Sequence, residues 1–242
     1  MKHSKIIKTG EYMPPLQENA SPRMNSFFRQ LKLLCLSPDK FFAELPVERV
    51  DLKIPALIIC ALFLVAIVGN YDTITAYTRT LELADPSAYP IVYVGLAATA
   101  LSPFLAWVSY SAVFYGVSYL YRGRGTFLQT LANVGYGCVP LIIGGLLHLV
   151  LFQFVSLPVQ DHFIPARVAA HATTVALIDA GIAIPVLLWC GFLCTAGMRH
   201  ARSLSARQAL VTVFVPVGLT IGAKIVWLLW KLASVAGLYT GL

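Results

Sequence analysis

The sequence predicts an all-α integral membrane protein with five transmembrane helices and an N-terminal cytoplasmic amphipathic helix. Of its 242 residues, 58% are hydrophobic and only 12% are charged, and the mean hydropathy is +0.74. Soluble domains carry about 25% charged residues, so the chain has too little polar surface for a water-soluble globule. This composition excludes a soluble cytosolic enzyme, and the 17 glycines and 14 prolines without a period exclude a collagen-like chain.

Five apolar stretches are long enough to cross a membrane. A spanning helix needs roughly 20 mostly apolar residues, because the hydrocarbon core is about 30 Å thick and each helical residue rises about 1.5 Å. The predicted spans cover about 53–71, 89–121, 134–155, 174–197 and 209–231. The second is longer than one straight crossing requires, so we expect it to bend near Pro103 and project beyond the bilayer.

The predicted domains follow from these spans. Residues 1–23 are polar and aperiodic, which predicts a disordered cytoplasmic tail. Residues 24–52 are expected to form cytoplasmic amphipathic or interfacial helices. The membrane domain covers 53–232, and 233–242 form a short outer tail.

Lysine and arginine are unevenly distributed between the two predicted faces. Of 18 such residues, 14 flank one face, three flank the other, and Lys224 lies within a span. The positive-inside rule therefore predicts a multi-pass protein with a cytoplasmic N-terminus and an outer C-terminus, in the plasma membrane if the source is prokaryotic. The charge bias accounts for the net charge of +7, so we exclude nucleic acid as a partner. The basic loop of Arg199, Arg202 and Arg207 serves orientation alone or also contacts anionic lipid headgroups.

Residue patterns on the cytoplasmic side predict several helix starts. In the amphipathic segment one face is apolar, formed by Phe27, Phe28, Leu31, Leu34 and Cys35. Ser37 is a predicted N-cap that precedes Pro38.

Two further helices are expected to begin on this side of the membrane. Thr126 is the predicted N-cap of a short helix whose Phe127, Leu128 and Leu131 face inward, and Ser205 is the predicted N-cap of the fifth span.

Short motifs lie in order along the chain. They are Ser37-Pro38-Asp39-Lys40-Phe41-Phe42, Asp51-Leu52-Lys53-Ile54-Pro55, Gly125-Thr126-Phe127, Gly135-Tyr136 with Pro140, and Leu204-Ser205 with Ala209. In order and spacing they resemble the motifs of the Yip1 domain family of five-span membrane proteins, over about residues 30–232. The resemblance assigns family-motif positions to Asp51, Leu52, Pro55, Gly135, Tyr136 and Pro140.

The resemblance implies a five-helix membrane fold. Eukaryotic relatives bind Rab-type GTPases and shape early secretory membranes, largely through cytosolic segments. Their Asp-Leu-x-Gly-Pro motif has glycine where this chain has Ile54, and the N-terminal region here is short. The chain is therefore more similar to prokaryotic members.

Three ionisable residues lie within predicted spans, where charge is costly and each such residue is a functional candidate. They are His148, Asp179 and Lys224, all about 10–12 Å below the outer surface by counting about 1.5 Å per residue. They are predicted to form a buried polar cluster with an Asp179–Lys224 pair. Its role is a structural salt bridge, a proton or solute relay, or, for Lys224, snorkelling to the interface.

No catalytic, cofactor-binding or metal site is predicted. His-Glu-x-x-His, Gly-x-Ser-x-Gly and phosphate-loop motifs do not occur in the sequence. Cys190 and Cys194 are interpreted as small buried hydrophobes rather than metal ligands. The prediction is a non-enzymatic protein that contacts the lipid bilayer and scaffolds a protein partner through its cytoplasmic face. The alternatives are a small transporter or channel that uses the polar cluster and, more distantly, a membrane-embedded enzyme.

Overall fold

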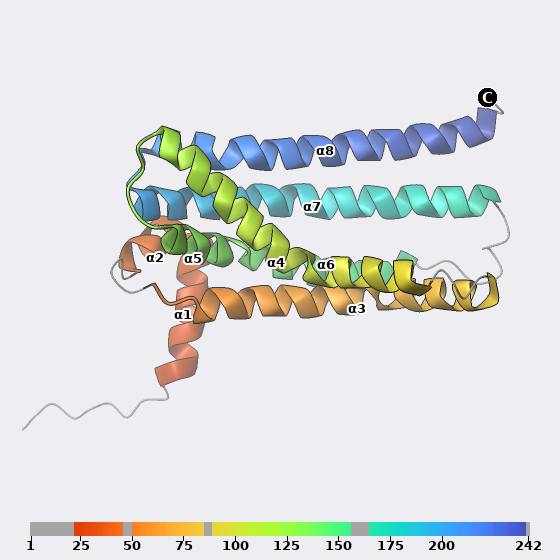
Figure 1. The fold of residues 1–242 in the computed structure, drawn as a ribbon, viewed down its shortest axis with the longest axis horizontal. Helices are drawn as coiled ribbons and strands as arrows, with labels where there is room; N and C mark the ends of the chain where they lie inside the picture. The colour runs from red at the N-terminus through yellow and green to blue at the C-terminus, as the bar shows by residue number, and fades with distance from the viewer. Residues whose placement is uncertain (1–21, 46–49, 85–88, 156–164, 241–242) are drawn as a thin grey trace, which may run out of the picture.

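The computed structural model describes residues 22–45, 50–84, 89–155 and 165–240. Within these ranges the chain forms helices and no strand, so the all-α class is confirmed (Figure 1). The helices are α1 (Pro22–Leu36), α2 (Pro38–Glu44), α3 (Lys53–Ala84), α4 (Tyr89–Leu120), α5 (Phe127–Gly137), α6 (Val139–Val155), α7 (Pro165–Arg202) and α8 (Ala206–Thr240). The predicted tail at 1–23 lies almost wholly outside the described residues.

Four segments of the described chain are long and apolar enough to cross a membrane. They are Tyr93–Leu120, Phe127–Leu151, Thr173–Arg202 and Ala206–Ser234. The predicted first span falls in α3, whose described apolar part, Lys53–Gly69, is shorter. The protein is therefore a multi-pass membrane protein, and the fifth crossing stays a prediction.

The third predicted span consists of two helices. α5 ends at Gly137 and α6 begins at Val139, with Cys138 as the C-cap residue between them. Pro140 has no N–H with which to bond the carbonyl of Tyr136, so the helical ladder is interrupted here. The Cys138 N–H instead bonds the Gly135 carbonyl at 3.2 Å.

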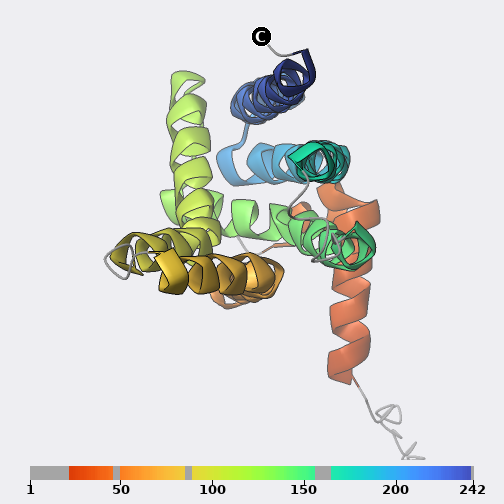
Figure 2. The same ribbon diagram turned by 90° about the vertical axis from the view of Figure 1, so that its right-hand side faces the viewer.

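The five long helices form a ring in which each packs on two neighbours. α3 packs on α4 and α6, α6 on α7, α7 on α8, and α8 on α4 (Figures 1 and 2). α4 changes direction along its length (Figure 1), and Pro103 lies inside it. The hydroxyls of Tyr110 and Thr220 hydrogen-bond α4 to α8, whereas the Phe104 ring lies 5.8 Å from the Phe63 ring of α3. α4 thus crosses the bundle from α8 to α3.

The N-terminal helices dock on one end of this ring. α1 lies across the long axis of the bundle (Figures 1 and 2), as expected of a helix in the headgroup plane. Its Leu34 is buried in a cluster with α2, α5, α6 and α7; the side chains of Phe27 and Phe28 lie outside the described residues. α2 begins at Pro38 after Ser37, as predicted, but the Ser37 hydroxyl makes no capping hydrogen bond.

Both other predicted N-caps are confirmed. Thr126 Oγ1 accepts the Gln129 N–H at 3.3 Å, and Gln129 Oε1 accepts the Thr126 N–H at 2.7 Å. Ser205 and Gln208 exchange the same pair of bonds, at 3.3 and 3.0 Å. These are capping boxes.

The inward orientation predicted for Leu128 is wrong, because its side chain is 51% exposed. Leu128 follows Phe127 directly, so its side chain is rotated by about 100° around the helix axis from that of Phe127.

Candidate functional site

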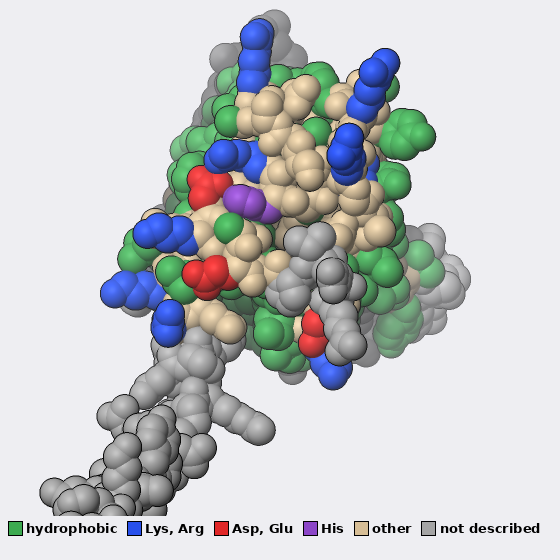
Figure 3. All heavy atoms as spheres, turned by 90° about the vertical axis from the view of Figure 1, so that its left-hand side faces the viewer, with side chains coloured by type: hydrophobic (Ala, Val, Ile, Leu, Met, Phe, Trp, Pro, Cys, Tyr) green, Lys and Arg blue, Asp and Glu red, His purple; other side chains and the backbone are tan. Residues whose placement is uncertain are grey.

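Cationic side chains gather at one end of the bundle, which we call the basic end. It is formed by α1, α2, the start of α3, the 121–126 connection between α4 and α5, the 203–205 connection between α7 and α8, and the helix ends that flank these connections. Figure 3 shows this end, where lysine and arginine side chains surround a smaller group of acidic and histidine side chains. The exposed cations include Arg29, Lys32, Lys40, Lys53, Arg122, Arg124 and Arg207.

The predicted basic loop needs correction. Arg199 and Arg202 lie in the last turn of α7, and Arg207 lies in the first turn of α8, so only residues 203–205 connect the helices. Arg202 is 1% exposed. Contact of Arg202 with lipid headgroups is therefore excluded, whereas Arg207 is exposed.

Arg202 joins three segments of the basic end. Its Nε donates to Ser118 Oγ at 2.9 Å, and its two terminal nitrogens donate to the carbonyls of Gly123, at 2.9 Å, and Gly125. Its guanidinium also lies 4.3 Å from the centre of the Tyr115 ring. The planar, five-donor guanidinium suits this set of fixed acceptors. Sequence reasoning missed this role; the glycine-rich turn at 123–125, whose carbonyls need donors, was the available signal.

A second set of contacts holds α2 against the bundle. The Phe41 ring packs edge-on against Phe42 and Tyr136, each at 5.2 Å between centroids. Outside this aromatic cluster, Arg199 donates to Asp39 Oδ1 at 2.8 Å, and His200 Nε2 lies 3.5 Å from the same oxygen. A cavity of about 290 Å³ lies beside the cluster, and Glu44, Asp51, Tyr136 and His200 contribute to its lining.

The structure brings the family-motif positions together. Pro55 is fully buried, and a methyl group at Gly135 would lie 2.6 Å from its Cβ. Glycine therefore permits the close packing of α3 on α5. Asp51 Oδ1 accepts the first N–H of α3, from Lys53, at 2.8 Å.

The remaining motif positions frame this contact. Leu52 supplies the carbonyl for the Ala56 N–H at 2.8 Å. Tyr136 packs on α2, and the buried Pro140 stands at the start of α6.

The three predicted intramembrane residues lie near one central cavity. Lys224 Nζ donates to Asp179 Oδ2 at 2.8 Å, with side chains 27% and 34% exposed. His148 and Asp179 both contribute to the wall of a cavity of about 600 Å³ inside the helix ring. The structure therefore pairs Asp179 with Lys224 and places His148 and Asp179 along the same cavity.

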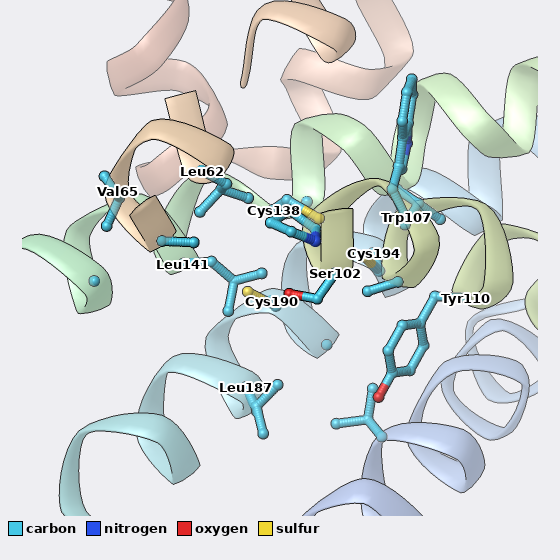
Figure 4. A pocket seen from close by; sticks show the side chains of 18 of the residues that line it. Leu62, Val65, Ser102, Trp107, Tyr110, Cys138, Leu141, Leu187, Cys190 and Cys194 are labelled. Carbon is cyan, nitrogen blue, oxygen red and sulfur yellow. The ribbon is translucent and has the colours of Figure 1, made fainter. Parts of the chain in front are cut away.

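The same cavity is bordered by three thiols. Cys138, Cys190 and Cys194 line it together with residues such as Leu62, Trp107 and Leu187 (Figure 4). All described cysteines are free, and across the described ranges no three His, Cys, Asp or Glu side chains are grouped to hold a metal ion.

Outside the spans, partial burial raises the pKa of the Cys35 thiol in α1.

Comparison with known proteins supports the family resemblance of the sequence. Residues 31–228 match the Yip1 domain. The chain belongs to the Yip1 domain family. Within the curated proteins, this Yip1 domain protein is 28% identical to an uncharacterised protein of Methanocaldococcus jannaschii over 116 residues, which are 46% of the chain and 79% of the relative. No solved structure matches.

Proposed function

We propose that this Yip1 domain protein is a non-enzymatic scaffold that organises protein partners through its basic end, which faces the cytoplasm. The observation that carries the proposal is the set of hydrogen bonds that holds this end together. Arg202 joins α7 to α4 and to the 121–126 connection, so the exposed Arg122 and Arg124 belong to a connection held in one conformation. A preorganised surface loses less conformational entropy when a partner binds.

The charge of the basic end indicates the chemistry of the partner. Arg122, Arg124 and Arg207 are exposed, whereas Arg199 pairs with Asp39 and Arg202 is buried. Exposed arginines favour a partner with acidic side chains, since guanidinium groups bind carboxylates through two parallel hydrogen bonds. The same charge orients the protein in the bilayer and attracts anionic headgroups.

Site-specific photocrosslinking in native membranes tests the proposal. We would place benzoylphenylalanine at Tyr121, an exposed aromatic beside Arg122, and at Trp227, an exposed aromatic in the predicted membrane part of α8. A scaffold gives discrete protein adducts at 121 that disappear with Arg122→Glu and Arg124→Glu, and lipid adducts at 227. Lipid adducts alone at both positions would contradict a protein partner.

Transport is the second candidate function, and the Asp179–Lys224 pair beside the central cavity is the observation that favours it. A small transporter or channel would use this cluster with His148. Most side chains around the cavity are apolar, which supports the scaffold instead, because a solute path needs polar partners. Flux into proteoliposomes that is lost with Asp179→Asn would favour transport.

A further inference from the structure

We propose that the central cavity is a binding site and that it holds the hydrocarbon chain of a membrane phospholipid. The cavity measures about 600 Å³, within the range of about 300–1,000 Å³ typical of ligand pockets. It lies inside the ring of α3, α4, α6, α7 and α8, and is partly open to the outside. This inference does not depend on the scaffold function proposed for the basic end.

The cavity is long in the direction of the helices. Its wall on α7 extends from Asp179 to Cys194, which is about 22 Å at about 1.5 Å per helical residue. One lipid chain occupies about half of the roughly 30 Å hydrocarbon core. The dimensions of the cavity therefore suit an extended lipid chain. An empty cavity of this size would also lose the dispersion contacts that protein interiors normally make.

The polar groups around the cavity are already bonded within the protein. Trp107 Nε1 donates to the Leu131 carbonyl at 2.8 Å, and Ser102 Oγ donates to the Thr99 carbonyl at 2.7 Å. The Tyr110 hydroxyl bonds Thr220. In the described parts of the chain, every buried side-chain nitrogen or oxygen has a hydrogen-bond partner. Ordered water needs two to four polar partners, so this wall favours an apolar occupant.

The two ends of the cavity differ. Toward the basic end, the cavity is lined by residues of a buried hydrophobic cluster, namely Phe114, Val134, Cys194 and Val217. Away from it, the wall carries Asp179, which is paired with Lys224. The terminal methyl group of the lipid hydrocarbon chain therefore points toward the basic end, and its ester end lies near the Asp179–Lys224 ion pair.

The path of α4 explains why a cavity remains between the helices. Toward its C-terminus α4 is bonded to α8 through Tyr110 and Thr220, and nearer its N-terminus it packs on α3 through Phe104. Since α4 crosses from one side of the ring to the other, it cannot fill the centre along its whole length. The cavity follows from the crossing.

Protection of the native thiols provides the first test. In full-length protein carrying Cys35→Ser and Cys60→Ser, the remaining thiols of Cys138, Cys190 and Cys194 line the cavity. The delipidated protein in a bulky sterol-based detergent is treated with N-ethylmaleimide in the presence of palmitoyl-oleoyl-phosphatidylcholine, oleate or glycerophosphocholine. We expect the phospholipid to slow labelling by about tenfold when its free concentration is about ten times the dissociation constant.

The three added compounds distinguish the possible sources of the bound hydrocarbon chain. Protection by phospholipid and none by glycerophosphocholine supports the proposal. Protection by oleate alone would assign the cavity to a free fatty acid, and protection by glycerophosphocholine alone would assign it to a headgroup; either result overturns the proposal. Unchanged labelling in every arm overturns it as well.

A matched pair of substitutions on α4 provides the second test. Ala106 lines the cavity, whereas Ala112 is exposed on the same helix and does not line it. Native mass spectrometry of the purified protein should show a retained phospholipid in the wild type and in Ala112→Phe, and its loss in Ala106→Phe. Equal retention by both variants would contradict binding in the cavity. The thiol experiment needs no substitution in the cavity and stands if Ala106→Phe fails to fold.

Discussion

Lys224 Nζ lies 2.8 Å from Asp179 Oδ2, joining α8 to α7 beside the central cavity. An ion in hydrocarbon is costly unless it is paired. A pair of this kind contributes little to the net free energy of folding, but removal of one partner leaves an uncompensated charge within the bundle.

The first prediction concerns this pair. Asp179→Asn and Lys224→Met should each lower the free energy of unfolding by about 2–4 kcal/mol, because each leaves one charge without its partner. The double variant should recover most of that loss. Thermal unfolding in detergent measures all four proteins, and small additive effects would show that the two side chains do not stabilise the fold together.

The second prediction concerns Arg202. A lysine at this position offers one compact ammonium in place of a planar fork, and so cannot satisfy Ser118 and both glycine carbonyls at once. Arg202→Lys should destabilise the protein by about 2–4 kcal/mol, since buried acceptors lose their donors. The exposed Arg207 supplies the matched control, because Arg207→Lys should change stability by less than about 0.5 kcal/mol. Similar melting temperatures for the two variants would refute the structural role of Arg202.

The third prediction concerns the contact between family-motif positions Gly135 and Pro55. Gly135→Ala places a methyl group 2.6 Å from Pro55 Cβ, and overpacking of this kind costs about 1–3 kcal/mol. At Gly116 in α4 an added methyl group meets no atom within 4 Å. Gly116→Ala should therefore be neutral or stabilising by up to about 1 kcal/mol, as helix propensity favours alanine. Denaturation of both variants in the same detergent measures the contrast.

The fourth prediction separates two contributions to the docking of α2. Phe42 is buried against the aromatic cluster, so Phe42→Ala should weaken docking by about 3–4 kcal/mol. Asp39 and Arg199 are 58% and 39% exposed, and Asp39→Ala should cost less than about 1 kcal/mol. Hydrogen exchange of the α2 amides measures local undocking directly. Faster exchange in Asp39→Ala than in Phe42→Ala would assign the docking to the ion pair.

Local patterns predicted much of the fold because they depend on neighbouring residues. The hydropathy of the chain established a helical membrane protein, and Thr126 and Ser205 were recognisable as caps because a capping box involves residues only three positions apart. Leu128 was misplaced because the prediction ignored the rotation of about 100° between neighbouring residues of a helix. The short helix after Thr126 was predicted, but the predicted span at 134–155 included its end, whereas α5 ends at Gly137 and α6 begins at Val139.

The sequence by itself determined that the chain is a helical membrane protein, how its cations are distributed, and which ionisable residues lie within apolar segments. Tertiary structure alone decided that Arg202 is buried, how closely the predicted pair of Asp179 and Lys224 approaches, and that the ring of helices leaves a central cavity. The physical reason is the range of the interactions. Apolar content and capping are local, whereas Arg202 meets Ser118 across 84 residues of chain, and a cavity forms only when several helices pack around it.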